Sequence, residues 1–129
     1  MRFTDTITIY NRKEVGFEEQ LIPSLLSGVH VEQTTGSDSS AEGDTNSGEL
    51  FVLIPFKPHK NSFLTPLEYA SADDKNSVWT LSPGDIITIG DTGAAESYAE
   101  LSARTEAYRI TAIKSFGFGG LPHWEVTAK

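Results

Sequence analysis

The sequence predicts a mainly β protein: a small antiparallel β-barrel with one or two short helices and a long loop over residues 34–48. Residues 5–10 alternate Thr and Ile before a Tyr, which is the period-2 pattern of a strand. Residues 79–90 place a Pro-Gly turn between two strand-like runs, and residues 123–127 alternate again. Helical segments are too few and too short for parallel crossovers, so we expect an antiparallel sheet whose closure removes its edges.

Length and composition restrict the classes of function. The 129 residues form one ordinary domain, residues 1–129, and the absence of cysteine excludes disulfides, thiolate metal sites and thiol nucleophiles. No apolar run approaches the roughly 18 residues of a membrane span, and the first residues lack a signal-peptide pattern, so we expect synthesis in the cytoplasm without membrane association. The net charge of −8 disfavours tight binding to nucleic acid.

The N-terminal half contains the first strands and their interruptions. After the strand at 5–10, the polar residues 11–14 predict a turn, and residues 20–22 predict a short strand that ends at Pro23, which cannot donate to a ladder. Residues 29–33 alternate again. The continuous apolar run at 50–55 predicts a deeply buried strand.

The C-terminal half contains both expected helices. Thr65 caps a short helix, with Pro66 at its first position and Glu68 completing a capping box. Residues 94–104 have helix-forming types and an i,i+4 Glu-Arg pair. Four more strands are predicted over residues 78–81, 85–89, 108–116 and 123–127. Six or seven short strands suit a barrel of SH3-like or OB-like size.

Two segments look like connections. Residues 34–48 are rich in Ser, Thr, Gly and Asp, and such a long insert is either an idle loop or a functional one. Residues 117–120 form a glycine-rich hairpin turn; they do not form a phosphate loop, because no Lys-Ser/Thr pair follows. Phe118 in this turn is either tucked back or an anchor for an interface.

The candidate chemistry is sparse. His30 with Glu32, and His123 with Glu125, each place an imidazole and a carboxylate on one strand face. Were the two strands adjacent, the pairs could form a four-ligand metal site; otherwise they are polar surface residues. A hydrolase would need the same residues to converge. The sequence offers no nucleophile elbow and no cofactor motif, so we expect no catalytic residues, no metal and no cofactor.

Several blocks occur in a characteristic order along the chain: Asp5–Asn11, Gly28–Val31, Thr65–Tyr69, Trp79–Asp85 and Pro122–Val126. Together they resemble the small minor capsid or head-completion proteins of long-tailed phages and prophages of Gram-positive bacteria. Those proteins are similar to head–tail connector or stopper subunits. The long loop at 34–48 departs from that pattern.

The resemblance implies a non-enzymatic virion protein that forms a homo-oligomeric ring between portal and tail. Its partners would be portal or adaptor and tail-completion proteins. Its location would be the virion neck, reached from the host cytoplasm during assembly. DNA would pass through the ring without specific binding, which suits the acidic composition. We expect contacts with neighbours from the 34–48 loop and the glycine-rich turn, through Ser37, Asp38, Ser39, Ser40, Glu42, Asp44 and Phe118.

An alternative is a small β-barrel module that binds a glycan or a peptide. Its binding platform would be exposed aromatic residues near 117–120. That hypothesis predicts a concave aromatic site on the monomer, whereas the connector hypothesis predicts extensive contacts made by loops.

Overall fold

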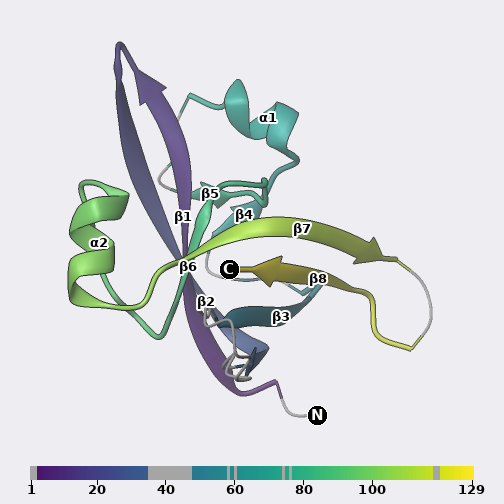
Figure 1. The fold of residues 1–129 in the computed structure, drawn as a ribbon. Helices are drawn as coiled ribbons and strands as arrows, with labels where there is room; N and C mark the ends of the chain where they lie inside the picture. The colour runs from purple at the N-terminus through teal and green to yellow at the C-terminus, as the bar shows by residue number, and fades with distance from the viewer. Residues whose placement is uncertain are drawn as a thin grey trace.

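The computed structural model describes residues 3–34, 48–57, 59, 61–73, 75, 77–117 and 120–129. The mainly β prediction is confirmed, because six antiparallel strands close into a barrel in the order β1-β2-β3-β8-β7-β6 (Figure 1). The barrel strands are β1 (Asp5–Val15), β2 (Glu18–Thr34), β3 (Glu49–Pro55), β6 (Ile86–Ile89), β7 (Tyr108–Phe116) and β8 (His123–Ala128). Outside the barrel lie a two-stranded parallel sheet and two helices: β4 (Ser62–Phe63), β5 (Val78–Trp79), α1 (Pro66–Ala70) and α2 (Tyr98–Arg104).

The first hairpin is much longer than the sequence predicted. The turn expected at 11–14 is wrong, since these residues continue β1 and pair with β2 as far as Val15 opposite Glu18. The chain turns instead at residues 16–17, where Gly16 adopts a φ of 65°. Polar composition misled the prediction, because a hairpin that projects into solvent has polar residues on both faces.

Pro23 does not end a strand, as the sequence predicted. It lies within β2 opposite Tyr10, and β2 pairs with β3 only from His30 onward. Pro23 therefore occupies a stretch of β2 that has a ladder on one side only, where a missing N–H is tolerated. Residues 20–22 and 29–33 belong to this single 17-residue strand.

The barrel interior is filled by the alternate residues of every strand. Ile7 and Ile9 of β1 pack with Val52 and Ile54 of β3 and with Val126 of β8, all of them buried. The aligned pairs Val52–Val126 and Ile54–Trp124 show that one face of β3 and β8 points into this core. The alternation read from the sequence is therefore the inside–outside alternation of a closed barrel.

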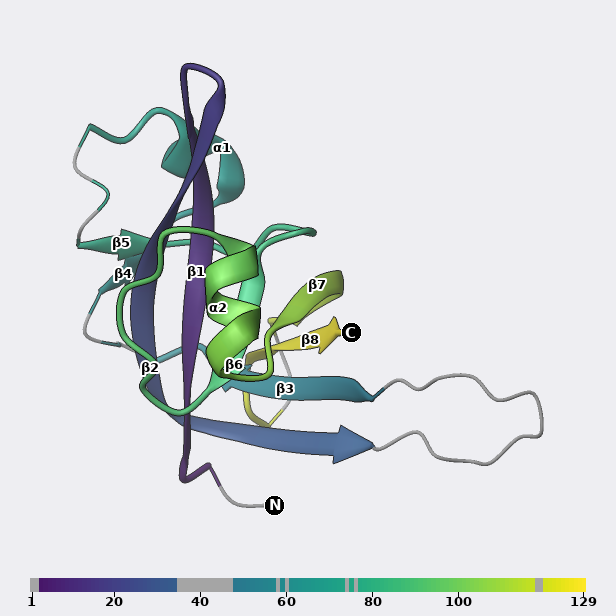
Figure 2. The same cartoon turned by 60° about the vertical axis from the view of Figure 1, so that its left-hand side comes forward.

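The outer face of β1 and β6 is also covered. Tyr10 and Ile86 form a second buried cluster with Leu101 of α2, which lies over these strands (Figure 2). Thr8 and Thr88 are buried beneath the segment that leads to α2, and Thr8 Oγ1 donates to the Gly90 carbonyl at 2.7 Å. Residues 7–10 of β1 are consequently covered on both faces.

Both predicted helices form. The α1 capping box is present: Thr65 Oγ1 accepts from the Glu68 amide, and the Glu68 carboxylate accepts from the Thr65 amide. α2 is shorter than the predicted 94–104, because the Ser97 side chain caps it and residues 94–96 lie before the cap. Its Glu100–Arg104 pair forms at 3.1 Å.

A buried polar network fixes the Pro-Gly turn of residues 82–85 against β1. Asn11 Nδ2 donates to Asp85 Oδ2 and to the Thr80 carbonyl, both at 2.8 Å, while the Thr80 amide donates to Asn11 Oδ1 at 3.2 Å. Arg12 Nε donates to Asp85 Oδ1 at 3.0 Å. These hydrogen bonds connect the Trp79–Asp85 block to the base of the projecting hairpin.

We expect Gly84→Ala to destabilise the protein more than Gly93→Ala. Both glycines have positive φ, 92° and 75°, so each substitution incurs about 1 kcal/mol of backbone strain. A Cβ on Gly84 would also lie 2.7 Å from Arg12 Nη2, whereas a Cβ on Gly93 meets nothing within 4 Å. Displacing the guanidinium adds about 1 kcal/mol through lost hydrogen bonds. Denaturant unfolding of both variants measures the difference, and equal losses would contradict this packing.

Candidate functional site

The predicted interface residues lie outside the part of the chain that the structure describes. This holds for the six residues of the 34–48 loop and for Phe118. Their role in contacts between subunits therefore stays a prediction.

The two His-Glu pairs do not converge. β3 lies between β2 and β8, so two strand spacings, about 10 Å, separate the pairs. Within each pair the partners bind one another: His30 Nε2 lies 3.0 Å from Glu32 Oε2, and His123 Nε2 lies 3.2 Å from Glu125 Oε2. A hydrogen bond with the Leu121 carbonyl is the main factor that raises the pKa of His123.

This separation removes the basis of the four-ligand hypothesis, which required adjacent strands. Across the described ranges, no group of three or more His, Cys, Asp or Glu is placed to hold a metal ion. The hydrolase hypothesis required the same convergence and loses its geometric support. Both pairs are instead arranged as polar residues on the outer face of the sheet.

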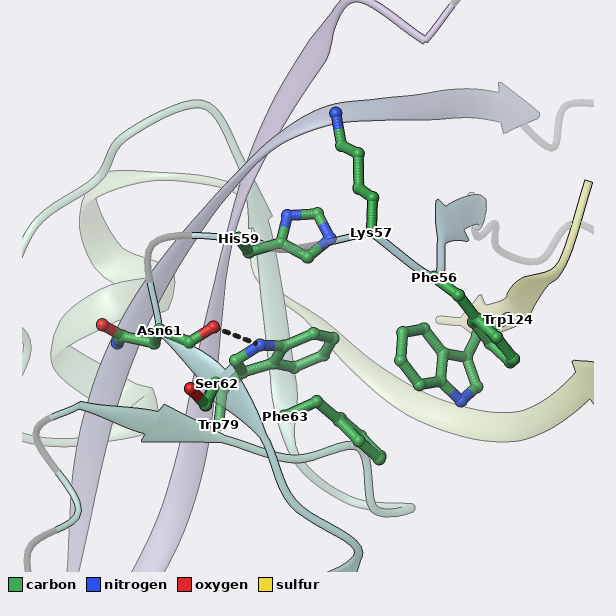
Figure 3. Close-up of a pocket in the computed structure, with 8 residues that line it drawn as sticks. All are labelled: Phe56, Lys57, His59, Asn61, Ser62, Phe63, Trp79 and Trp124. Atoms are coloured by element: carbon green, nitrogen blue, oxygen red, sulfur yellow. Dashed lines mark hydrogen bonds between the residues drawn. The ribbon is translucent and has the colours of Figure 1, made fainter.

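An aromatic cavity of about 440 Å³ opens where the segment after β3 meets β4, β5 and β8 (Figure 3). Its walls are Phe56, Lys57, His59, Asn61, Ser62, Phe63, Trp79 and Trp124. The small parallel sheet builds one wall, because Phe63 of β4 is aligned with Trp79 of β5. The indole Nε1 of Trp79 donates to the Asn61 carbonyl at 3.1 Å and so fixes the loop against the barrel.

The rings of the cavity form a continuous cluster. Phe63 lies 5.0 Å from Trp79 and 4.5 Å from Trp124, measured between ring centroids, and the two tryptophans are 5.5 Å apart. Phe56 packs on Trp124 at 4.3 Å. Trp79 is fully buried and Trp124 partly buried, while Phe56 is 41% exposed and forms the rim. Such tilted and edge-to-face arrangements suit another aromatic or apolar group.

Among the lining residues that the structure describes, Lys57 carries a positive charge, and its side chain is exposed. A Cβ on Gly28 would lie 2.1 Å from Lys57 Nζ, so the glycine of β2 leaves room for this side chain. Figure 3 shows the ammonium directed toward β2 and away from the tryptophans. Burial lowers the pKa of His59, and the nearby Lys57 lowers it further against the opposing effect of the Pro55 carbonyl. Near pH 7 the His59 imidazole is therefore neutral. The aromatic cavity then has one neutral imidazole in its wall and the Lys57 ammonium beside it.

The turn of the projecting hairpin is the second unusual surface. Beyond Tyr10, β1 pairs with β2 alone, and every side chain described from residue 16 to residue 20 is exposed. Phe17 at the turn is fully exposed, with the exposed Glu18 and Glu19 following it. From Tyr10 to Gly16 the hairpin extends about 20 Å.

Neither surface was predicted from the sequence. Trp79 is buried in the barrel core, whereas Trp124 is only partly buried, and both also line the cavity. A signal existed at Phe56 and Phe63, two aromatic residues flanking a polar connection directly after a buried strand. A second existed at Gly16–Phe17, where a glycine beside an aromatic residue interrupts a charged run.

The barrel with its projecting hairpin and aromatic cavity defines a small β-barrel protein with two candidate contact surfaces. Over residues 2–129 the chain matches a protein family, and it belongs to that family: DUF6751, a family of unknown function. No curated protein and no solved structure matches it significantly. Among the helices of the described ranges, none has both the length and the apolar character to cross a membrane.

Proposed function

We propose that the chain is a structural subunit of a phage or prophage particle. In this role it completes the head as part of a ring between portal and tail, around the channel for DNA. The proposal combines the ordered blocks that resemble head-completion proteins with one structural observation. That observation is the projecting β1–β2 hairpin, which carries a fully exposed Phe17 at its turn.

The hairpin supports an assembly role because it adds little to the stability of a monomer. Two-stranded hairpins are marginal in water, and the stretch at residues 16–20 buries none of its described side chains. A rigid barrel with an arm about 20 Å long reaches a neighbour beyond its own core. Ring subunits require such a reach, and head-to-tail contacts close into rings when the rotation permits.

Charge is consistent with this role. The net charge of −8 gives the surface a predominantly negative character, which repels the phosphate backbone of DNA. A channel lined by such subunits lets DNA slide past without binding it. Portal or adaptor proteins on one side and tail-completion proteins on the other remain the proposed partners.

Deleting the gene from the phage or prophage that encodes it tests the proposal. We expect filled heads that lose DNA or fail to join tails in electron micrographs, and recovery of normal particles when the gene is supplied in trans. Normal infectious particles from the deletion strain would overturn the proposal. Portal and capsid genes upstream of this gene, with tail genes downstream, would support it independently.

We expect deletion of residues 36–47 to leave the barrel folded and to impair particle assembly. The β2–β3 ladder continues to Thr34 opposite Glu49, so the deletion leaves residues 35 and 48 as a two-residue connection, a common hairpin length. Thermal unfolding should therefore change little. Complementation of the deletion strain measures assembly, and full restoration of infectious titre would refute a role for this loop.

The aromatic cavity supports a second candidate function, a module that binds a glycan or a peptide. This cavity is lined by Phe56, Phe63 and the two tryptophans, whereas the sequence placed the platform near residues 117–120. Titration of the purified monomer with soluble glycans and aromatic peptides, followed by tryptophan fluorescence, tests it. Saturable binding of a glycan would favour this function over the ring.

A further inference from the structure

We infer that Phe17 of one subunit inserts into the aromatic cavity of the next copy of the same chain. This inference rests on the proposed function and specifies its subunit contact. The occupant of the cavity is then the turn of a neighbouring β1–β2 hairpin. Three observations carry it: the shapes of the two surfaces, their charges and their positions in the molecule.

The shapes are complementary. Phe17 is a fully exposed ring at the end of a narrow two-stranded arm, so it can enter a cavity on a neighbouring molecule. The cavity of about 440 Å³ has the size of a small-ligand site, and rings line it on several sides. Aromatic anchors in such pockets dominate the binding energy of many interfaces.

The charges are also complementary. Glu18 follows Phe17 directly, and Lys57 lies beside the cavity; both side chains are exposed. Within the part of the chain that the structure describes, neither residue forms an ion pair. Inserting the ring brings the carboxylate of one subunit toward the ammonium of its neighbour. Such pairing fixes the register of an interface and disfavours wrong partners.

The two surfaces lie in different parts of the molecule. In Figures 1 and 2 the hairpin turn stands at one end of the molecule, and β4 and β5 lie away from that end, beside the lower part of the hairpin. The arm is paired along its whole length, so it does not fold back into its own cavity. Because Phe17 and the cavity lie on separate surfaces, inserting one into the other makes a head-to-tail contact. Such a contact repeats from copy to copy, and the assembly is a ring when the rotation between copies allows closure.

Cross-linking within particles tests this contact, and the wild-type chain itself cannot react because it has no cysteine. The variant Glu18→Cys/Lys57→Cys keeps Phe17 and every ring of the cavity. Particles assembled with it are treated with a short bismaleimide and analysed under denaturing conditions. We expect a ladder of multimers beyond the dimer. The matched control is Glu18→Cys/Leu67→Cys, since Leu67 is 83% exposed on α1 and lies outside the cavity.

The outcomes separate the two proposals. A ladder from the 18/57 pair and none from the 18/67 pair supports the contact. Particles that contain the protein but give no ladder, or equal ladders from both pairs, overturn the contact and leave the proposed function standing. Normal particles that lack the protein overturn the proposed function, and the inference with it.

Charge reversal gives a second readout if the cysteine variants fail to assemble. We expect Glu18→Lys and Lys57→Glu each to reduce complementation at least about tenfold, because like charges then oppose one another across the contact. The double variant restores opposite charges between neighbours, and we expect it to recover most of the titre. Failure of the double variant to exceed either single variant would overturn the inference.

We also expect Phe17→Ala to weaken subunit association about thirtyfold.

Discussion

We expect Asp85→Ala to destabilise the protein by about 3 kcal/mol at neutral pH, a large part of the total stability of a domain of this size. The substitution removes the acceptor for Asn11 Nδ2 and for Arg12 Nε, at 2.8 and 3.0 Å. The Asp85 side chain is 4% exposed and that of Arg12 33% exposed, so the arginine regains water in the variant. The expected loss of unfolding free energy therefore lies at the low end of the range for a buried ion pair that loses one partner.

Chemical denaturation followed by tryptophan fluorescence measures this loss. The matched control is Asp91→Ala, which removes an exposed carboxylate two residues beyond β6 and should change the free energy of unfolding by less than about 0.5 kcal/mol. Similar small losses for both variants would show that the network does not hold the turn to β1.

The same network makes the free energy of unfolding depend on pH. Burial raises the pKa of Asp85 above its ordinary value of 3.8, against the opposing hydrogen bonds from Asn11 and Arg12. A raised pKa means that the contribution of Asp85 is complete below about pH 4 and declines as the pH rises through the folded-state value. Asp85→Ala cannot titrate, so its deficit relative to the wild type should be larger near pH 4 than at neutral pH. A deficit that grows with pH would contradict this assignment.

We expect Trp79→Ala to destabilise the protein by about 3–5 kcal/mol. The indole is fully buried, packs against Phe63 and Trp124, and donates a hydrogen bond to the Asn61 carbonyl. Its removal leaves a void in the barrel core and releases the loop that forms the cavity wall. Calorimetric unfolding measures the loss in free energy.

Leu67→Ala is the control for Trp79→Ala, because this large apolar side chain is 83% exposed and contributes little to the core. Its substitution should change stability by less than about 0.5 kcal/mol. A Trp79→Ala variant within about 1 kcal/mol of the wild type would contradict the core position of this residue.

The strand pattern of this fold was readable because alternation reflects the two faces of a barrel wall. β7 was predicted with its observed bounds, and β3 and β8 each to within one residue. The projecting hairpin could not be predicted, since residues 16–20 are all exposed and period-2 patterning disappears without a buried face. Pro23 then appeared to be a stop, because only the topology shows that it lies beside an unpaired edge.

The candidate site was less predictable than the fold. The cavity brings together side chains from three segments, and their proximity depends on β4 pairing with β5 and on β8 pairing with β3. Phe56 and Phe63 border the first segment, and Trp79 and Trp124 come from the other two. No local pattern encodes those long-range pairings. The separation of the two His-Glu pairs likewise depends on β3 lying between their strands.

Electron cryo-microscopy of purified particles tests the central proposal most directly. Particles carrying the wild-type protein are compared with particles from the deletion strain, and the difference density locates the subunit. We predict a ring of barrels at the neck between portal and tail, with each projecting hairpin reaching the adjacent barrel. Purified infectious particles with no density and no peptide from this chain would contradict the proposal that it is a structural protein of the virion.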